Sequence, residues 1–176
     1  NGISSKVPIT DVKVPVWSQS DRSDLYWYVA EAQADGSYKV QVDIAKHGYN
    51  YGDYCFGAYA STQNGIQQHV GGMSVSMKQP KAVIKAIADT KETTYTINVS
   101  NVGVAGGIKS MVVAVWSVAG GQDDLLWYEA TQVSKGSWTA EIPILNHRMA
   151  GAYCADVYAI NVAGKSIFMG GTDFTV

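Results

Sequence analysis

The same sequence pattern occurs twice in this chain, and this internal repeat constrains the fold more than any other feature. VPVWSQSDRSDLYWY at residues 14–28 returns as VAVWSVAGGQDDLLWY at residues 113–128. Later parts return in the same order, GSYKVQVDIAKH as GSWTAEIPILNH and DYCFGAYA as AYCADVYA. Each copy of such a repeat is one structural module. The 176 residues therefore predict two modules, which we place at residues 1–79 and 80–176.

Charge and hydropathy exclude several classes of partner. The formal net charge is −2, from 13 basic and 15 acidic residues, and the basic residues form no stripe. This balance argues against nucleic acid and against an anionic membrane as main partners. No apolar run approaches the roughly 18 residues that a membrane-spanning helix needs. The chain starts at Asn rather than Met, so we expect it to be part of a longer protein.

The pattern of strands and turns predicts an all-β fold. Residues 37–42 and 137–142 alternate between apolar and polar side chains, which is typical of half-buried strands. Gly36 and Gly136 mark tight hairpin turns at the start of these strands. Short strands with turns every 8–12 residues or so are typical of a sandwich or barrel. We therefore predict two tandem immunoglobulin-like β-sandwich modules.

The first module is expected to lack its N-terminal strands. Residues 82–88 and 93–99 read as a hairpin that precedes the repeated pattern of the second module, whereas Asn1 of the first module aligns near Asn101. The missing hairpin should leave an unpaired sheet edge or an open core face. We expect a partner segment to cover it, and strand-mediated self-association is one way to do so.

The WS…DL.WY strings, the Gly-Ser-aromatic strand, the His and the Gly-Gly strand together resemble the Bsp-like repeat of streptococcal cell-wall hydrolases and secreted surface proteins. The resemblance covers essentially the whole chain. Its most specific part is GQDDLLWY in the second module, which the first module replaces by DRSDLYWY. The resemblance implies an all-β accessory module in an extracellular, cell-wall-associated setting, and it implies no catalytic residue.

Aromatic side chains are the main candidates for a binding surface. Flat rings exposed on a β-face can stack on sugar rings or peptide planes. Strand alternation sets Trp27 and Trp127 on one face and Tyr28 and Tyr128 on the other, and we expect the two tryptophans to be core. The predicted ligand-binding residues are Tyr28, Tyr128, Trp17, Trp116 and Tyr26.

Metal and catalytic sites are weaker hypotheses. Asp21, Asp24, Asp123 and Asp124 could contribute to a calcium site, but Asp side chains before a strand more commonly bind turn backbone. A Cys nucleophile with a His base could be formed in each module by the pairs His47 with Cys55 and His147 with Cys154. Duplicated nucleophiles without an orienting partner are improbable. We therefore predict no metal, no cofactor and no catalytic residue.

Two further expectations concern single residues. Cys55 and Cys154 occupy equivalent positions of separate modules, so we expect them to be unpaired. Tyr54 and Tyr153 follow a turn at a strand entrance, which resembles the tyrosine corner of immunoglobulin-like sandwiches.

The duplication favours binding or spacing over catalysis, since a catalytic site is normally unique. We therefore expect a non-catalytic repeat that binds a cell-wall polymer, either peptidoglycan or an associated polysaccharide. The alternatives are a structural spacer or protein-interaction module and, less favoured, a Cys/His peptidoglycan hydrolase.

Overall fold

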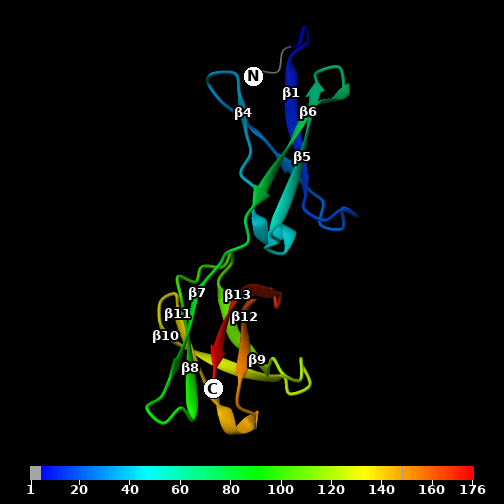
Figure 1. The fold of residues 1–176 in the computed structure, drawn as a ribbon. Helices are drawn as coiled ribbons and strands as arrows, with labels where there is room; N and C mark the ends of the chain where they lie inside the picture. Colours follow the sequence, from blue (N-terminus) through cyan, green and yellow to red (C-terminus); the bar gives the residue numbers. More distant parts are fainter. Residues whose placement is uncertain (1–4, 148) are drawn as a thin grey trace. The chain divides into compact units, whose positions relative to one another are not determined.

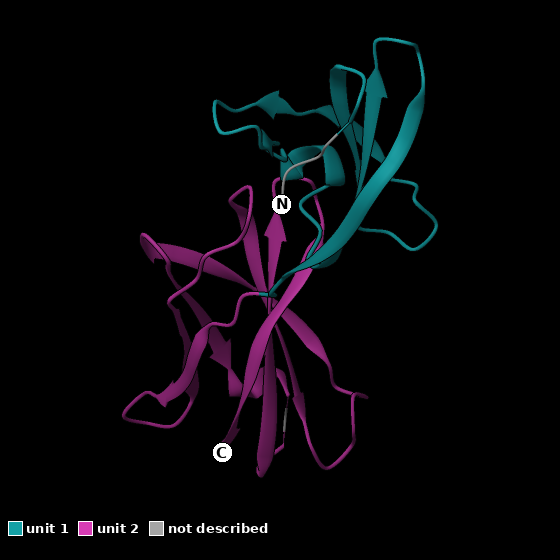
Figure 2. Cartoon of the chain, turned by 90° about the horizontal axis from the view of Figure 1, so that it is seen from above, with its two compact units in different colours: residues 1–79 teal, residues 80–176 magenta. Residues whose placement is uncertain are grey.

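The computed structural model describes residues 5–147 and 149–176. The chain forms two compact units, Asn1–Gln79 (module one) and Pro80–Val176 (module two), which are coloured separately in Figure 2. Strands form both modules, and the only helical segments among the described residues are two single 3₁₀ turns. The predicted all-β fold with two immunoglobulin-like modules is confirmed.

Module two is a complete sandwich of seven strands, ordered β13-β12-β9-β10-β11-β8-β7 (Figure 1). The strands are β7 (Val83–Ala88), β8 (Thr94–Ser100), β9 (Ile108–Ser117), β10 (Leu126–Ser134), β11 (Ser137–Pro143), β12 (Ala152–Asn161) and β13 (Ser166–Thr175). Strand β10 belongs to both layers, because residues 126–130 pair with β9 and the following residues pair with β11. One layer is therefore β13-β12-β9-β10, and the other is β10-β11-β8-β7.

The core of module two lies between these layers. Ile97 on β8, Ile142 on β11, Val113 on β9 and Val157 on β12 are each fully buried. The predicted alternation of residues 137–142 is confirmed, since Trp138, Ala140 and Ile142 all point inward and are buried. Burying side chains of this size contributes about 1.5–3 kcal/mol each, which is why the alternation produces a stable sandwich.

Module one repeats the first of these layers. Its sheet has the order β2-β1-β5-β6, the counterpart of β10-β9-β12-β13. The strands of module one are β1 (Ile9–Trp17), β2 (Tyr26–Val29), β3 (Glu31–Ala32), β4 (Tyr38–Lys39), β5 (Gly52–Thr62) and β6 (Gln67–Met77). The opposing layer is reduced to the short pair β3–β4, and no counterpart of β7 or β8 exists among the described residues of module one.

The predicted strand at residues 37–42 is much shorter than expected. Only Tyr38 and Lys39 are in a strand, whereas β11 spans seven residues at the equivalent place in module two. The physical reason is the missing neighbour: β11 pairs with β8 over six residues, and residues 40–43 have no such strand beside them among the described residues.

Both sheets carry a β-bulge at the same place. The register shifts between Ala58 and Tyr59 in module one and between Val157 and Tyr158 in module two. The unpaired residues are Val70 and Met169, on β6 and β13. A bulge bends its strand and turns an extra side chain toward one face, which here is the core face, since Met169 is 1% exposed.

Candidate functional site

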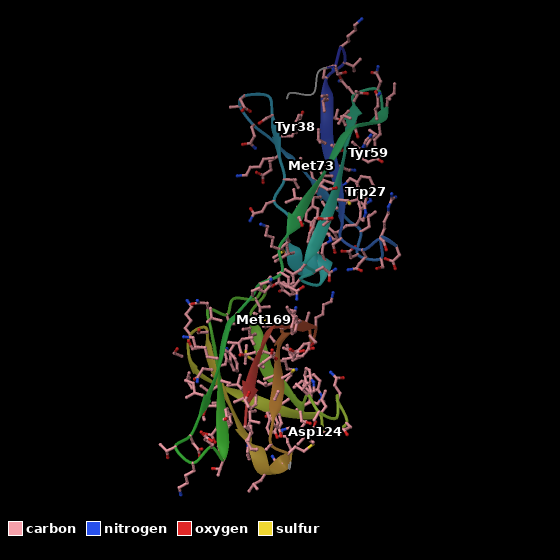
Figure 3. The ribbon with its side chains drawn as sticks, in the orientation of Figure 1. Trp27, Tyr38, Tyr59, Met73, Asp124 and Met169 are labelled. Atoms are coloured by element: carbon pink, nitrogen blue, oxygen red, sulfur yellow. The ribbon has the colours of Figure 1, made fainter. Side chains whose placement is uncertain are left out.

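Each sheet carries a row of three rings on the face that points away from the core. In module one the row runs from Trp27 on β2 through Tyr59 on β5 to His69 on β6. The ring centroids of Trp27 and Tyr59 are 5.4 Å apart, and those of Tyr59 and His69 are 5.1 Å apart. Figure 3 shows Trp27 and Tyr59 close together on the same side of module one. The three side chains form a continuous aromatic surface.

Module two repeats this row with nearly the same geometry. Trp127 on β10 lies 5.5 Å from Tyr158 on β12, and Tyr158 lies 5.3 Å from Phe168 on β13. The Trp–Tyr interplanar angles agree within a degree, at 55° in module one and 54° in module two. We refer to these two rows, Trp27–Tyr59–His69 and Trp127–Tyr158–Phe168, as the aromatic ladders.

The ladders are exposed at their ends, while the central Tyr59 and Tyr158 are half-buried. Trp27 is 46% exposed and Trp127 is 57% exposed. Strands β2 and β5 are second neighbours across β1, so their backbones are roughly 9.5 Å apart. The Trp27 and Tyr59 rings can approach to 5.4 Å only by leaning toward each other over β1. The result is a low surface of rings that suits a flat ligand.

The surroundings of the ladder differ between the modules. In module one Gly57 lies beside the rings, and a Cβ on it would meet Pro15 Cγ and a Tyr59 ring carbon at 3.4 Å. A shallow hollow of about 340 Å³ adjoins Trp27, with Lys13, Val29 and Gln67 in its lining. Gly57 therefore leaves the Tyr59 ring in van der Waals reach of its backbone position, with no side chain between them.

Module two places carboxylates at the equivalent positions. Asp156 corresponds to Gly57 and Asp173 to Ser74. Burial raises the pKa of Asp156, and the nearby charge of Asp173 raises it further. The pKa of the Cys154 thiol is raised by burial and then by its hydrogen bond with Asp173. The ladder of module two thus has hydrogen-bonding acceptors beside its rings, whereas that of module one has glycine and serine.

The inner side of module one contains a hydrogen-bond network around a buried histidine. The ring of His47, 1% exposed, places Nε2 2.9 Å from the Tyr28 hydroxyl and Nδ1 3.0 Å from the Asp24 carbonyl oxygen. The Tyr28 hydroxyl also donates to the Asp43 carbonyl. Since the neighbours of Nδ1 are acceptors, this nitrogen carries a proton. Both ring nitrogens are therefore engaged in holding loops together.

Asp24 anchors the loop between β1 and β2. Its carboxylate accepts hydrogen bonds from the backbone N–H groups of Ser18 and Gln19 and from the Ser18 hydroxyl. Burial raises the pKa of Asp24, but these hydrogen bonds and the nearby His47 outweigh it and lower the pKa to about 2. Asp24 thus binds turn backbone, as the simpler sequence interpretation expected.

Module two repeats the network with small changes. His147 Nε2 lies 3.0 Å from the Tyr128 hydroxyl, and Nδ1 lies 3.2 Å from Asp124 Oδ2. Asp124 accepts the Ser117 N–H. Burial raises the pKa of Asp124, but the bonds from Ser117 and His147 lower it overall. Conserving loop geometry explains why the His and Asp recur in both copies of the sequence pattern.

The predicted ligand-binding residues are divided between the two faces. Trp17 and Trp116 lie on the outer face, opposite Cys55 and Cys154, at the end of the ladder sheets. Tyr28 and Tyr128 point to the inner side, where their hydroxyls contact the histidines. Tyr26, 43% exposed, shares the inner side with Tyr28 and lies edge-on to it.

The prediction that Trp27 and Trp127 are core residues is wrong. Their neighbours Tyr28 and Tyr128 turn inward instead, because a buried His offers each phenol a hydrogen-bond partner. Tyr59, Tyr158, His69 and Phe168 were not identified as candidates. They are recognisable once the strand register is known, since Tyr59 pairs with His69 and Tyr158 with Phe168.

The His and Cys side chains do not form catalytic pairs in this geometry. Cys55 and Cys154 are free thiols, and Cys55 Sγ lies 3.7 Å from Ser74 Oγ on the outer face. The rings of His47 and His147 lie on the inner side, with their nitrogens engaged as described above. A thiol would have to reach through the sheet to use the histidine as its base.

The tyrosine-corner prediction is confirmed in both modules. The Tyr54 hydroxyl donates to the Asn50 carbonyl at 2.8 Å, and the Tyr153 hydroxyl donates to the Met149 carbonyl at 2.6 Å. In each case the acceptor lies four residues upstream, so the bond ties the strand to the turn before it.

Within the described ranges, no three His, Cys, Asp or Glu side chains gather as metal ligands would. None of the helical segments in residues 5–147 and 149–176 has the length and hydropathy to cross a membrane.

Comparison with solved structures gives distant similarities. A polysaccharide deacetylase from Bacillus cereus matches 54% of this chain and 30% of its own length, at 16% identity and a TM-score of 0.47. A tetra-tandem repeat in the extending region of a large adhesion protein matches 97% of this chain and 43% of its own length, at 17% identity and a TM-score of 0.43. The chain thus spans less than half of either structure. Similarities this distant carry no argument about what the chain binds.

Comparison of the sequence is more specific. No curated protein matches the chain. The family described as the GBS Bsp-like repeat matches residues 1–75 and 85–174, one match for each module.

Proposed function

Because this chain belongs to the GBS Bsp-like repeat family, we propose that it is a non-catalytic repeat that binds a cell-wall polymer in an extracellular setting. We further propose that sugar rings of this polymer lie across the aromatic ladders. A family of repeats and an all-β fold suggest a module without catalytic activity.

The observation that carries the proposal is the repetition of the ladder. Exposed Trp and Tyr rings are costly to leave in water, and patches of them commonly mark interaction sites. Here both modules place an exposed Trp beside a half-buried Tyr, with ring centroids 5.4 Å and 5.5 Å apart. The surrounding residues differ, with Gly57 in one module and Asp156 in the other. A shared function explains why the rings keep their geometry while their neighbours change.

The chemistry of the ladder suits a glycan. A pyranose ring presents a flat face of C–H groups that packs on an aromatic ring, while its hydroxyls remain free for hydrogen bonds at the rim. Asp156 precedes Tyr158 by two residues on β12, with one strand position between them, and its carboxyl group supplies an acceptor for such hydroxyls. Two weak sites on one chain also raise the apparent affinity for a polymer that repeats its own units.

The proposal is tested by retention of the chain on purified streptococcal sacculi, with and without their wall polysaccharide. The ladder variant is the double substitution Trp27→Ala with Trp127→Ala. We expect it to reduce retention at least tenfold, because aromatic anchors carry most of the energy at such surfaces. Thermal melting should be nearly unchanged, since both side chains are about half exposed.

The matched control is Tyr26→Ala with Leu126→Ala. These residues precede Trp27 and Trp127 on the same strands, are 43% and 39% exposed, and point to the other face. Retention should be unchanged in this control. Equal loss in both variants would place binding elsewhere, and no retention of the unmodified chain would favour the spacer function.

A further inference from the structure

Module one has an apolar surface where module two has a core. Val70 is 41% exposed, Met73 is 63% exposed and Val75 is 48% exposed, all on β6. Val70 and Met73 line a hollow of about 430 Å³, together with Val12, Val14, Tyr38, Val40 and Phe56. Figure 3 shows Tyr38 and Met73 close together, on the side away from Trp27 and Tyr59. We call the surface formed by the lining of this hollow and the neighbouring Val75 the open face of module one.

The same surface is covered in module two. Met169 is the counterpart of Val70 and is only 1% exposed. A Cβ on Gly170 would lie 3.4 Å from Ile84 Cδ1 of β7, whereas a Cβ on the equivalent Gly71 would meet nothing within 4 Å. Strand β7 therefore packs on the bulge in module two, and the bulge in module one has no such cover among the described residues.

Strand β8 completes the cover of module two. Its Ile97 and Val99 are 0% and 1% exposed. Its Tyr95 ring stacks on Phe174 at 4.6 Å, and the hydroxyl donates to the Thr175 carbonyl. Tyr95 thus contacts Phe174 and Thr175, and the corresponding residues of module one are Val75 and Ser76.

A backbone edge is also left unpaired in module one. Residues 94–99 of β8 pair with 138–143 of β11, from Trp138 with Val99 to Pro143 with Thr94. At the other side the Ala82 N–H donates to the Met169 carbonyl. In the described part of module one, residues 40–43 pair with no strand. Module one thus has an apolar floor, the side chains of its open face, and an unpaired backbone edge at residues 40–43. In module two one hairpin, β7–β8, covers the equivalent of both.

We infer that the open face of module one is a docking site for a two-stranded β-hairpin of the β7–β8 type, with alternating apolar residues that match Ile84, Tyr95, Ile97 and Val99. The hairpin's second strand extends the sheet at residues 40–43, and its first strand packs on Val70 and Gly71. This site lies on the opposite side of the sheet from the aromatic ladder and does not depend on the proposed glycan binding.

The backbone edge favours a hairpin over two open faces packed together. Face-to-face pairing of two copies would bury Val70 and Met73 but bring no strand to residues 40–43. Backbone N–H and C=O groups buried without partners are costly. A hairpin buries the apolar floor and pairs the edge at once, which is the mode of β-strand addition.

The test uses a peptide of residues 81–101 titrated into the full chain. Amide hydrogen exchange should slow at residues 38–43 and 70–75, and calorimetry should show saturable binding. In the peptide, Ile97→Asp should abolish binding, because it would place a charge in the apolar floor. In the chain, Met73→Lys should weaken binding at least tenfold, while Ile66→Lys should have no effect. Met73 and Ile66 are similarly exposed, at 63% and 62%, so neither change should unfold the chain.

An isolated hairpin is only marginally stable, so the same segment should also be fused through a flexible linker before Asn1. The fusion raises the effective concentration to millimolar levels or so. We expect a higher melting temperature of module one, reversed by Ile97→Asp in the added copy. Absence of protection in both formats would overturn the inference. A chain that dimerises through Met73 and ignores the peptide would show that face-to-face pairing occupies the open face instead.

Discussion

Trp27 and Trp127 occupy matching positions on matching four-stranded sheets, yet the layers beneath these sheets differ. Under Trp127 lies a second sheet, built from β11, β8 and β7. Under Trp27 lies the short pair β3–β4 and an open face. The outer face therefore does not depend on a complete core, because the ladder geometry is the same in both modules. Both modules also share the loop network around a buried histidine, His47 in one and His147 in the other.

The largest expected difference between the modules is in the cost of removing an inward side chain. Val42 and Ile142 are equivalent, but Ile142 is fully buried whereas Val42 is only half-buried. Ile142→Ala should destabilise module two by about 2–5 kcal/mol, and Val42→Ala should cost module one less than about 1 kcal/mol. Urea unfolding followed by hydrogen exchange of peptides from each module separates the two effects. Equal costs would show that module one is as well packed as module two.

The next difference concerns acid stability. The folded-state pKa of Asp24, about 2, is below its ordinary value of 3.8, so ionised Asp24 stabilises module one above pH 3.8. This contribution, on the order of 2 kcal/mol, is lost as the pH falls from about 4 to about 2. Asp24→Asn should lower the urea midpoint of module one at pH 6. It should also reduce the further loss of stability of module one between pH 4 and pH 2.

Module two provides the control for this measurement. Asp124 plays the same part there, and its pKa is also lowered. Asp124→Asn should therefore act on module two and leave the acid response of module one unchanged. If Asp124→Asn destabilised module one instead, the loop held by Asp124 would not act on its own module alone.

The smallest expected effect comes from the tyrosine corners. Tyr54→Phe and Tyr153→Phe each remove one hydrogen bond to a backbone carbonyl four residues upstream. Each should cost about 1 kcal/mol. The two costs should be similar despite the different layers below, because the bond is local to one turn. A much smaller cost in module one would show that its turn is already loose.

The sequence predicted the faces of several strands but not the inward face of β2 and β10. Tyr38, Val40 and Val42 point inward as the alternation predicted, and the repeat predicted equivalent sheets. Alternation alone separates Trp27 from Tyr28 without saying which is inside. That choice depends on His47, which is nearly twenty residues away in the sequence and forms a hydrogen bond with the Tyr28 hydroxyl. Such a contact follows from the fold and not from the local pattern.

The ladders could not be found from the sequence for a related reason. Trp27, Tyr59 and His69 come from three strands, and only the register brings them together. The bulge at Val70 shifts this register by one residue, so simple alternation along β6 assigns His69 to the wrong face. By contrast, Tyr54 and Tyr153 were predictable, because the tyrosine corner is a local contact between a Tyr and the turn four residues before it.

Strand β10, which pairs with β9 and then with β11, gives module two a property that matters when repeats stand next to each other in one chain. By joining the two layers it removes two of the four edges that separate sheets would have, and the Ala82–Met169 hydrogen bond brings the remaining two together. Neighbouring repeats of similar sequence are prone to exchanging strands while they fold. A module whose sheet nearly closes on itself offers its neighbours little to pair with. Module two therefore offers few unpaired strand edges to a neighbouring repeat, whereas module one keeps an open face that a hairpin can fill.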